Sequence, residues 1–200
     1  PVVTIGVPNH NEPQIDQTRA GLLTLGGAVV VSNDPDGRGV GWAMREGLKE
    51  VRTEWVLFAM ADGSEEIACL RYLIAKVHQS LQPLVWGDRW RLGTVTGYPV
   101  WKRLANRVGN HVIAWVTRRA YYDWTDPAKA YRTDLLRQID WSDDFRSAVE
   151  IPVRYIRKFP PMFISVVPMH WTERTAGHSA YRLKHALGCL HALGRVFLYG

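Results

Sequence analysis

Residues 2–12 read VVTIGVPNHNE, a run rich in β-branched residues that ends in a polar turn. Val, Ile and Thr favour strands, and a continuous apolar run is typical of a strand that is buried on both faces of a parallel sheet. Pro8, Asn9 and Asn11 then end the strand. The segment therefore predicts a central strand with polar side chains just past its carboxyl end.

The segments that follow alternate between helix and strand patterns. We predict helices over 13–25, 40–51 and 66–80, and strands over 28–32, 55–61 and 83–87, with 28–32 as a second buried strand. Strands separated by helices of this length predict an α/β fold with a doubly wound, mostly parallel sheet flanked by helices. Ligands bind such sheets where the carboxyl ends of the strands meet their loops.

The second half of the chain is less regular. We predict a long helix over 97–119 with Lys102, Arg103 and Arg107 on one face, a helix over 147–157 that Pro152 breaks early, and a strand over 162–169. Residues 181–198 form a basic amphipathic pattern, with an apolar stripe of Leu183, Leu187, Leu190 and Phe197. Such a helix can lie in a bilayer interface, but an apolar stripe can equally pack on its own domain. We expect one domain over 1–200.

Charge and cysteine content narrow the classes of partner. The 200 residues include 25 Lys and Arg against 19 Asp and Glu, a net charge of +6 that suits nucleoside diphosphates, lipid phosphates or an anionic membrane surface. Cys69 and Cys189 are far apart and lack metal-type spacing, so we expect reduced thiols in a cytoplasmic protein. No stretch reaches the roughly 18 apolar residues of a spanning helix, which leaves peripheral binding to the cytoplasmic face of a membrane as the alternative.

Six segments carry motifs in a fixed order. Thr4–Glu12 is similar to P-x-x-N-E, Asp36–Leu48 to N-x-G-K-G-x-A-x-R-x-G-L, and Val56–Ser64 occupies the place of an Asp-x-Asp motif after a hydrophobic strand. Three later segments are similar to G-S-R-Y, D-P-T-x-G-F-R-x-Y-R and E-V-P-I-x-W-x-x-R-x-x-G-x-S-K; they are 86–90, 125–132 and 166–179. Together these motifs resemble the family 2 glycosyltransferases of the dolichol-phosphate mannose synthase-like, polyprenyl-phosphate group, over nearly the whole chain.

The resemblance implies a GT-A-like fold and an inverting hexosyltransferase, with a nucleotide-sugar half over 1–95 and an acceptor half over 96–200. Its donor would be a GDP- or UDP-hexose and its acceptor a polyprenyl phosphate at the membrane surface. A phosphate monoester is already an anion at neutral pH, so such an acceptor needs positioning by cations and no catalytic base. Arg89 and Arg103 match the family's acceptor-phosphate arginines, and Arg107 and Arg174 are further candidates.

The donor side of the predicted site consists of loop residues at the strand ends. Asp62 occupies the metal motif and would hold Mg²⁺ or Mn²⁺, which neutralises the diphosphate leaving group. The amide and carboxylate side chains near the first two strands can bind base and ribose, and Arg38 offers charge to the diphosphate. The complete donor set is Pro8, Asn9, Asn11, Glu12, Asp34, Asp36, Arg38 and Gly63, with Arg103 beside it. Asp126 is expected to pair with Arg132 and order its loop, and Glu150 to be structural.

Two departures from the family pattern limit these expectations. Met60 replaces the first aspartate of the metal motif, which puts metal dependence in doubt. The family also has a further strand and helix before its glycine-rich helix. Either that unit is absent here or residues 2–12 take the place of the second strand, in which case Pro1 would not be the natural start.

Four other readings compete with sugar transfer to a lipid. A soluble transferase with a non-lipid acceptor would share the same motifs, and Met60 also suits a degenerate transferase that only binds ligands. A dinucleotide-binding dehydrogenase is disfavoured, because Trp42 stands where the Gly37–Gly39 spacing requires Gly or Ala. Nucleic-acid binding is disfavoured because no recognition motif accompanies the basic charge.

Overall fold

The computed structural model describes residues 2–120, 122–161, 163–173, 188–189 and 191–196. A six-stranded sheet of order β2-β1-β3-β6-β4-β7 forms its centre. Its strands are β1 (Val3–Asn9), β2 (Ala28–Asn33), β3 (Trp55–Phe58), β4 (Leu84–Asp88), β6 (Lys129–Arg132) and β7 (Ser165–Pro168). All neighbours are parallel except β6, which runs antiparallel to both β3 and β4. The expected mostly parallel α/β sheet is therefore confirmed.

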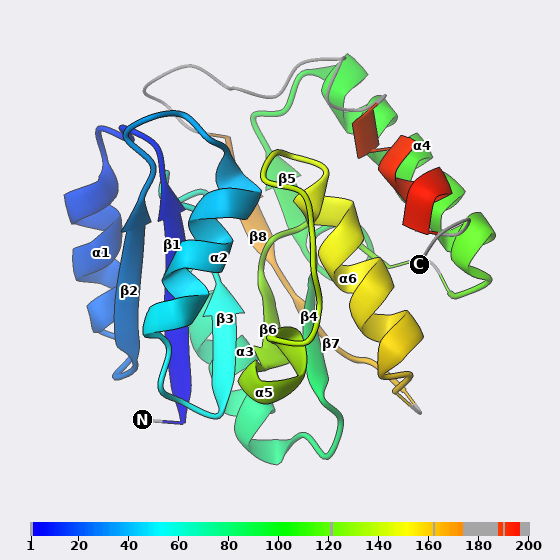
Figure 1. Cartoon of the computed structure of the whole chain (residues 1–200). Coiled ribbons are helices and arrows are strands. Elements are labelled where there is room, and N and C mark those ends of the chain that lie inside the picture. The colour runs from blue at the N-terminus through cyan, green and yellow to red at the C-terminus, as the bar shows by residue number, and fades with distance from the viewer. Residues whose placement is uncertain (1, 121, 162, 174–187, 190, 197–200) are drawn as a thin grey trace.

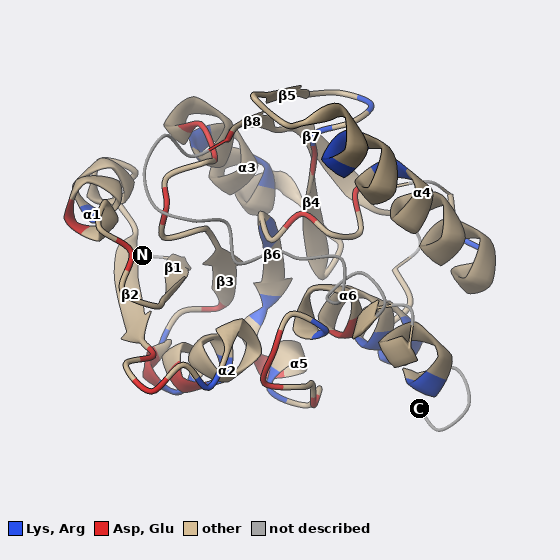
Figure 2. Cartoon of the chain, turned by 90° about the horizontal axis from the view of Figure 1, so that it is seen from above, with Lys and Arg blue, Asp and Glu red and all other residues tan. Residues whose placement is uncertain are grey.

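Helices cover both faces of this sheet (Figures 1 and 2). The helices α1 (Ile15–Leu23) and α3 (Ile67–Gln79) pack on one face. On the other face lie α2 (Val40–Glu50), α5 (Thr133–Leu136) and α6 (Ser147–Lys158), while α4 (Val100–Thr117) lies along an outer edge of the fold. Alternate residues of β3 point to the two faces, so that Trp55 and Leu57 join the α3 core while Val56 and Phe58 join the α6 core.

A second, two-stranded sheet stands at the carboxyl end of β4 and β7. It pairs β5 (Thr94–Thr96) in parallel with β8 (His170–Thr172), with Val95 opposite Trp171. Met169 connects β7 to β8 and is fully buried. This small sheet places Trp171 beside the ends of the central strands.

Three details differ from the sequence expectations. β2 is not buried: it is the edge strand of the described sheet, and its side chains are exposed or half-buried because no strand covers its outer side. Pro152 does not break its helix, since α6 continues to Lys158 and eight of its twelve residues are buried. The antiparallel β6 was not expected, because Lys129–Arg132 is short and lacks a β-branched run.

The C-terminal segment is described only in part. Residues 191–196 are helical, and Ala192, Leu193 and Val196 are buried, the last two in the same core as α6. The stripe expected from Leu183, Leu187, Leu190 and Phe197 lies outside the described residues. None of the described helices is long and apolar enough to cross a membrane.

Candidate functional site

A cavity of about 620 Å³ opens at the carboxyl ends of β1 and β3. Pro8 and Phe58 contribute from these strands, and Met60 and Asp62 from the loop after β3. The helices α4 and α6 form the wall on the other side, and Trp171 of β8 closes one end. The cavity thus stands where ligands bind in doubly wound α/β folds.

Asp62 is held in this cavity by the turn that follows β3. Its Oδ1 accepts hydrogen bonds from the backbone N–H of Ser64 at 3.1 Å and from the Ser64 hydroxyl at 2.6 Å. Gly63 makes the turn possible, because its φ of 65° lies in the left-handed region that favours glycine. The expected metal residue therefore lines the cavity in a defined orientation.

Met60 lines the cavity two residues before Asp62, and a carboxylate lies behind it. The Met60 N–H donates to both oxygens of Glu65, at 3.2 and 3.1 Å. Burial raises the pKa of Glu65 well above its ordinary value, and the nearby charges of Asp126 and Asp62 raise it further. Because a thioether is a poor ligand for hard cations such as Mg²⁺, the motif supplies one suitable donor, Asp62.

Asp62 is not part of a three-residue metal-ligand cluster among the described residues. The cluster that does occur there joins Glu66, Cys69 and His170, whose ligand atoms lie within 4.8 Å of one another. None of these three residues lines the cavity. A cation at Asp62 would accordingly take most of its remaining ligands from a bound diphosphate and water.

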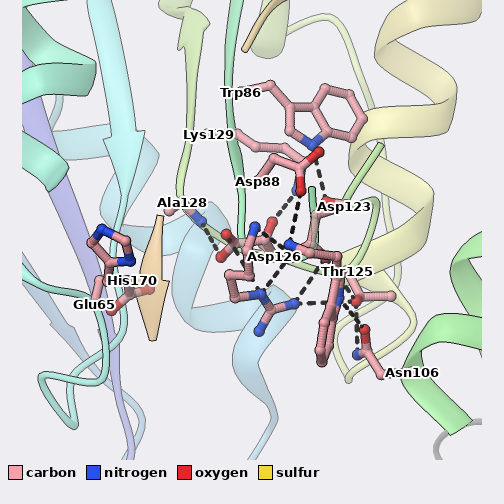
Figure 3. A network of polar contacts seen from close by, with 12 residues as sticks. Glu65, Trp86, Asp88, Asn106, Asp123, Thr125, Asp126, Ala128, Lys129 and His170 are labelled. Carbon is pink, nitrogen blue, oxygen red and sulfur yellow. Dashed lines mark hydrogen bonds and ion pairs between the residues drawn. The ribbon is translucent and has the colours of Figure 1, made fainter. Parts of the chain in front are cut away.

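Arg89 lines the cavity but is held by two buried carboxylates. These are Asp123 and Asp126, which Figure 3 labels within a network of polar contacts. Its Nε donates to Asp123 Oδ2 at 2.6 Å and its Nη2 to Asp123 Oδ1 at 2.9 Å, while Asp126 Oδ2 lies 3.6 Å from Nε. The rings of Trp171 and Trp90 lie 4.8 and 5.8 Å from its guanidinium carbon. The ion pairs hold the pKa of Arg89 well above its ordinary value despite burial.

The charged layer around Arg89 contains two groups that titrate abnormally. Burial raises the pKa of Asp126 to about 6, against the opposing effect of the Arg89 charge. Burial also lowers the pKa of Lys129 to about 8, and its Nζ bonds to the carbonyl oxygens of Trp124 and Asp126. Arg132 does not pair with Asp126 as expected; it bonds to Glu54 at 2.9 Å and lies 3.4 Å from Asp134.

The expected donor residues of β1 form a buried cluster beside Pro8. Asn9 donates to Asn33 Oδ1 at 2.7 Å, and its own Oδ1 accepts from the Glu12 N–H at 3.1 Å. Asn9 and Glu12 are buried, whereas Asn11 is exposed with a φ of 52°. Of this group only Pro8 contacts the cavity itself.

Asp34 follows β2 and organises the glycine-rich turn. Its two carboxylate oxygens accept from the N–H groups of Arg38 at 2.8 Å and Gly39 at 2.7 Å. Asp36 and Arg38 are exposed, and the Arg38 guanidinium stacks on Trp42 at 4.6 Å. The structure therefore gives Asp34 a structural task and leaves Asp36 and Arg38 at the surface outside the cavity.

The glycines of this turn serve helix packing. A Cβ at Gly41 would lie 2.0 Å from the Ser142 carbonyl oxygen. Any side chain would therefore clash with this oxygen, and only glycine fits at this position. The Trp42 N–H bonds to the Asp143 carbonyl at 2.9 Å. Glu150 holds the same loop from α6, accepting from the Ser142 N–H and hydroxyl at 2.6 and 3.0 Å. This agrees with the structural role expected for Glu150.

The remaining expected arginines lie apart from this layer. Arg103 is exposed on α4 and donates to the Val95 carbonyl at 3.2 Å. Arg107 is exposed on the same helix, 5.7 Å from the Trp90 ring. Arg174 lies outside the described residues.

Sequence reasoning did not identify several cavity and network residues. Asp123 and Lys129 were not singled out, since a buried ion pair depends on contacts between distant segments. Lys102 and Glu173 also line the cavity and pair at 2.8 Å, and the Lys102 ammonium lies 4.2 Å from the Tyr98 ring. Only the segment that joins α4 to β6, with Asp123 and Asp126 close to the matched motif at 125–132, offered a hint.

The sequence matches no protein-family model. The fold is similar to glucosyl-3-phosphoglycerate synthase from Mycobacterium tuberculosis, solved with Mn²⁺, UDP-glucose and phosphoglyceric acid. The TM-score is 0.74 at 12% identity, over 96% of this chain and 78% of that chain. The same enzyme with Mg²⁺ and UDP gives 0.72 at 12% identity over 96% and 78%, and with Mn²⁺ and UDP-glucose 0.71 at 14% over 98% and 76%. This chain therefore has the fold of the GT-A glycosyltransferases.

Proposed function

We propose that this chain transfers a hexose from a nucleoside-diphosphate sugar to an acceptor, with a divalent cation held at Asp62. The observation that carries the proposal is the position of Asp62, which projects into the cavity from the carboxyl end of β3. The similar enzyme of M. tuberculosis has been solved with UDP-glucose and Mn²⁺, which supports a UDP-hexose as the donor. A GDP-hexose is the alternative.

The charges of the cavity support the need for a cation. Among its described lining residues, the carboxylates Asp62, Asp126 and Glu173 outnumber the cations Arg89 and Lys102. Both cations already have carboxylate partners. A diphosphate that entered would meet a site without spare positive charge in the described part of the chain. A bound Mg²⁺ or Mn²⁺ would neutralise the charge that develops on the leaving diphosphate.

The nucleoside is proposed to lie beside β1 and β2. Pro8 contacts the cavity, and Asn9 and Glu12 lie buried at the adjoining end of β1. Asp34 holds the neighbouring turn through both of its carboxylate oxygens. Amide and carboxylate groups at such positions can bind the hydroxyl groups of a ribose or the edge of a base. Asn11, Asp36, Arg38 and Gly63 are on the exposed loops around this region and would act at its rim.

For the acceptor we retain a polyprenyl phosphate. The α4 wall of the cavity is apolar, with Trp101, Leu104, Val108 and Val112 facing it, and can accommodate a hydrocarbon chain. The phosphate would attack the anomeric carbon directly, with inversion, and no base is required. Arg103 and Arg174 would position it, because Arg89 is already held by Asp123 and Asp126. A small phosphorylated acceptor is the alternative, since the M. tuberculosis enzyme has been solved with phosphoglyceric acid.

A catalytically degenerate binding module is the second candidate function, favoured by Met60 in the cavity. One set of variants separates it from a transferase. Asp62→Asn should abolish hexose transfer and weaken Mn²⁺-dependent UDP or GDP binding, whereas Met60→Asp should tighten Mn²⁺ binding because it adds a second carboxylate. Calorimetry measures the nucleotide affinity, and release of UDP or GDP with each polyprenyl phosphate or phosphoglycerate acceptor measures turnover.

The matched control is Asp140→Asn, because the Asp140 side chain is 95% exposed and remote from the cavity. It should leave metal binding and turnover at the level of the unmodified protein. Normal turnover in Asp62→Asn would exclude the proposed site. Donor binding without turnover, in both the unmodified protein and Met60→Asp, would establish the binding module instead.

A further inference from the structure

Exposed apolar side chains are concentrated on α4. Val100, Trp101, Leu104, Val108 and Trp115 are exposed by 83%, 56%, 62%, 52% and 81%. They recur at intervals of three, four and seven residues, so they form one stripe along the helix. These values show that the stripe is not packed against the described part of the protein: Trp101, Leu104 and Val108 border the open cavity, and Val100 and Trp115 lie outside it.

The inward face of α4 is instead partly polar. Asn110 is fully buried; its Oδ1 accepts from the Trp124 N–H at 2.7 Å and its Nδ2 donates to Asn106 Oδ1 at 2.8 Å. Asn106 in turn donates to Thr125 Oγ1 at 3.0 Å. Only Asn110, Ile113 and Ala114 are buried among the eighteen residues of the helix. The apolar stripe is therefore not what holds α4 to the protein.

The surroundings of the stripe are uniformly basic. Between Asp88 and Asp123 the sequence contains no acidic residue, and Figure 2 shows blue but no red on α4. Lys102 is paired with Glu173, but four exposed arginines border the helix: Arg103, Arg107, Arg118 and Arg119. The partner of this surface must offer both apolar material and negative charge.

We propose that α4 docks this protein onto an anionic lipid bilayer, with the stripe in the interface and the arginines among the head groups. Tryptophans near both ends of the stripe, Trp101 and Trp115, suit the interface between hydrocarbon and water. A second copy of this chain would bring two clusters of like charge together, and a nucleic acid would leave the apolar stripe in water. The bilayer satisfies both features.

This surface is not the C-terminal segment to which the sequence pointed, where Ala192, Leu193 and Val196 are buried. It is continuous with the candidate site, because Trp101, Leu104 and Val108 also line the cavity. The inference rests on the proposed function in one respect: docking would bring the cavity to a lipid-linked acceptor that stays in the bilayer. Membrane binding itself can be measured without any substrate.

The test is flotation of the full chain with vesicles of phosphatidylcholine, with and without phosphatidylglycerol. Binding should require the anionic lipid and weaken as salt is added. Val100→Ser with Trp115→Ser, and separately Arg118→Gln with Arg119→Gln, should each lower the vesicle partition coefficient by roughly tenfold or more. None of these four residues lines the cavity. Thermal unfolding should be unchanged, since Val100, Trp115, Arg118 and Arg119 are exposed.

Leu81→Ser is the matched control, because Leu81 is 95% exposed but lies in the turn between α3 and β4, away from α4. It should bind vesicles as well as the unmodified protein. Failure of the unmodified protein to bind anionic vesicles, or equal binding by the α4 variants, would overturn the inference. If the unmodified protein did not bind nucleotide in calorimetry, that result would count against the proposed function. It would not bear on whether α4 binds vesicles.

Discussion

The helices α4 and α6 both border the candidate cavity, yet they use their residues in opposite ways. α6 buries eight of its twelve residues, whereas α4 buries three of eighteen. In α6 the apolar side chains face the sheet, while in α4 most of the large apolar side chains face outward or into the cavity. The difference indicates that α6 stabilises the fold, and it leaves the apolar side chains of α4 accessible to a partner or ligand.

The two helices are also attached by different forces. Tyr155 of α6 is fully buried, packs at 5.0 Å from the Tyr131 ring centroid and 5.5 Å from that of Phe159, and donates its hydroxyl to the Pro83 carbonyl at 2.7 Å. α4 joins the same core through Ile113, with Val112 and Val116 packed against it. It is also attached through Asn106 and Asn110 to the segment 124–125, which is tied to the charged layer of Arg89. Hydrophobic burial thus holds α6, whereas α4 depends on buried polar contacts as well.

The largest effect should follow from removal of the α6 anchor. Tyr155→Ala should destabilise the whole protein by about 3–5 kcal/mol, because it leaves a cavity in the main core. Denaturant unfolding measures the loss, and Tyr155→Phe serves as the control. That variant keeps the ring and should lose only about 1 kcal/mol with the hydrogen bond to Pro83. A loss of less than about 1 kcal/mol in Tyr155→Ala would show that α6 is not a core helix.

The sequence predicted those elements whose pattern lies within one short segment, and it missed features that depend on pairing between distant segments. The β1 run, the α2 and α3 helices and the extent of α4 followed from periodicity and turn residues. The edge position of β2 and the antiparallel β6 depend on pairing between segments far apart in the chain. Pro152 was misjudged because burial of the surrounding α6 residues outweighs the loss of one backbone hydrogen bond.

The second prediction uses pH to test the charged layer to which α4 is attached. Asp126, in the charged layer next to α4, has a pKa of about 6 in the folded protein against an ordinary 3.8. Because the folded pKa is raised, this group favours folding below pH 3.8, and that contribution is lost as pH rises through about 6. At about 1.36 kcal/mol per pKa unit the change is on the order of 3 kcal/mol.

Asp126→Asn removes this titration, so its stability relative to the unmodified protein should improve between pH 4 and pH 7 by an amount of that order. Denaturant unfolding of both proteins at each pH gives the difference, in which groups that do not interact with Asp126 cancel. The pKa values of Glu65 and Lys129 depend on the Asp126 charge, so these two groups also contribute to the difference. Tyr155→Phe is the control, because its stability difference should not vary over this range. A difference between Asp126→Asn and the unmodified protein that stays constant with pH would contradict the expected titration.

The candidate site was predicted in outline from the sequence. Asp62, Pro8 and Arg89 all line the cavity, since strand-end motifs report which loops meet at one edge of a sheet. The partners of Arg89 were not foreseen, because Asp123 is brought to it by the fold across 34 positions of sequence. The apolar stripe of α4 was likewise missed, since the pattern of a helix does not say which of its faces meets the protein.

The smallest effect concerns the polar attachment of α4 itself. Asn110→Ala should cost about 1–3 kcal/mol, because the buried Trp124 N–H loses its acceptor. The better helix propensity of Ala offsets a few tenths of a kcal/mol of this loss.

Hydrogen exchange measures the effect on each helix. In Asn110→Ala the α4 amides should exchange faster with no change in α6, whereas Tyr155→Ala should speed amide exchange in both helices through global unfolding. Trp115→Ala, a change at a side chain that is 81% exposed on the same helix, should alter neither helix. If Asn110→Ala left α4 exchange unchanged, apolar contacts of Ile113 and Ala114 would be the true attachment, and the contrast between the two helices would be one of degree.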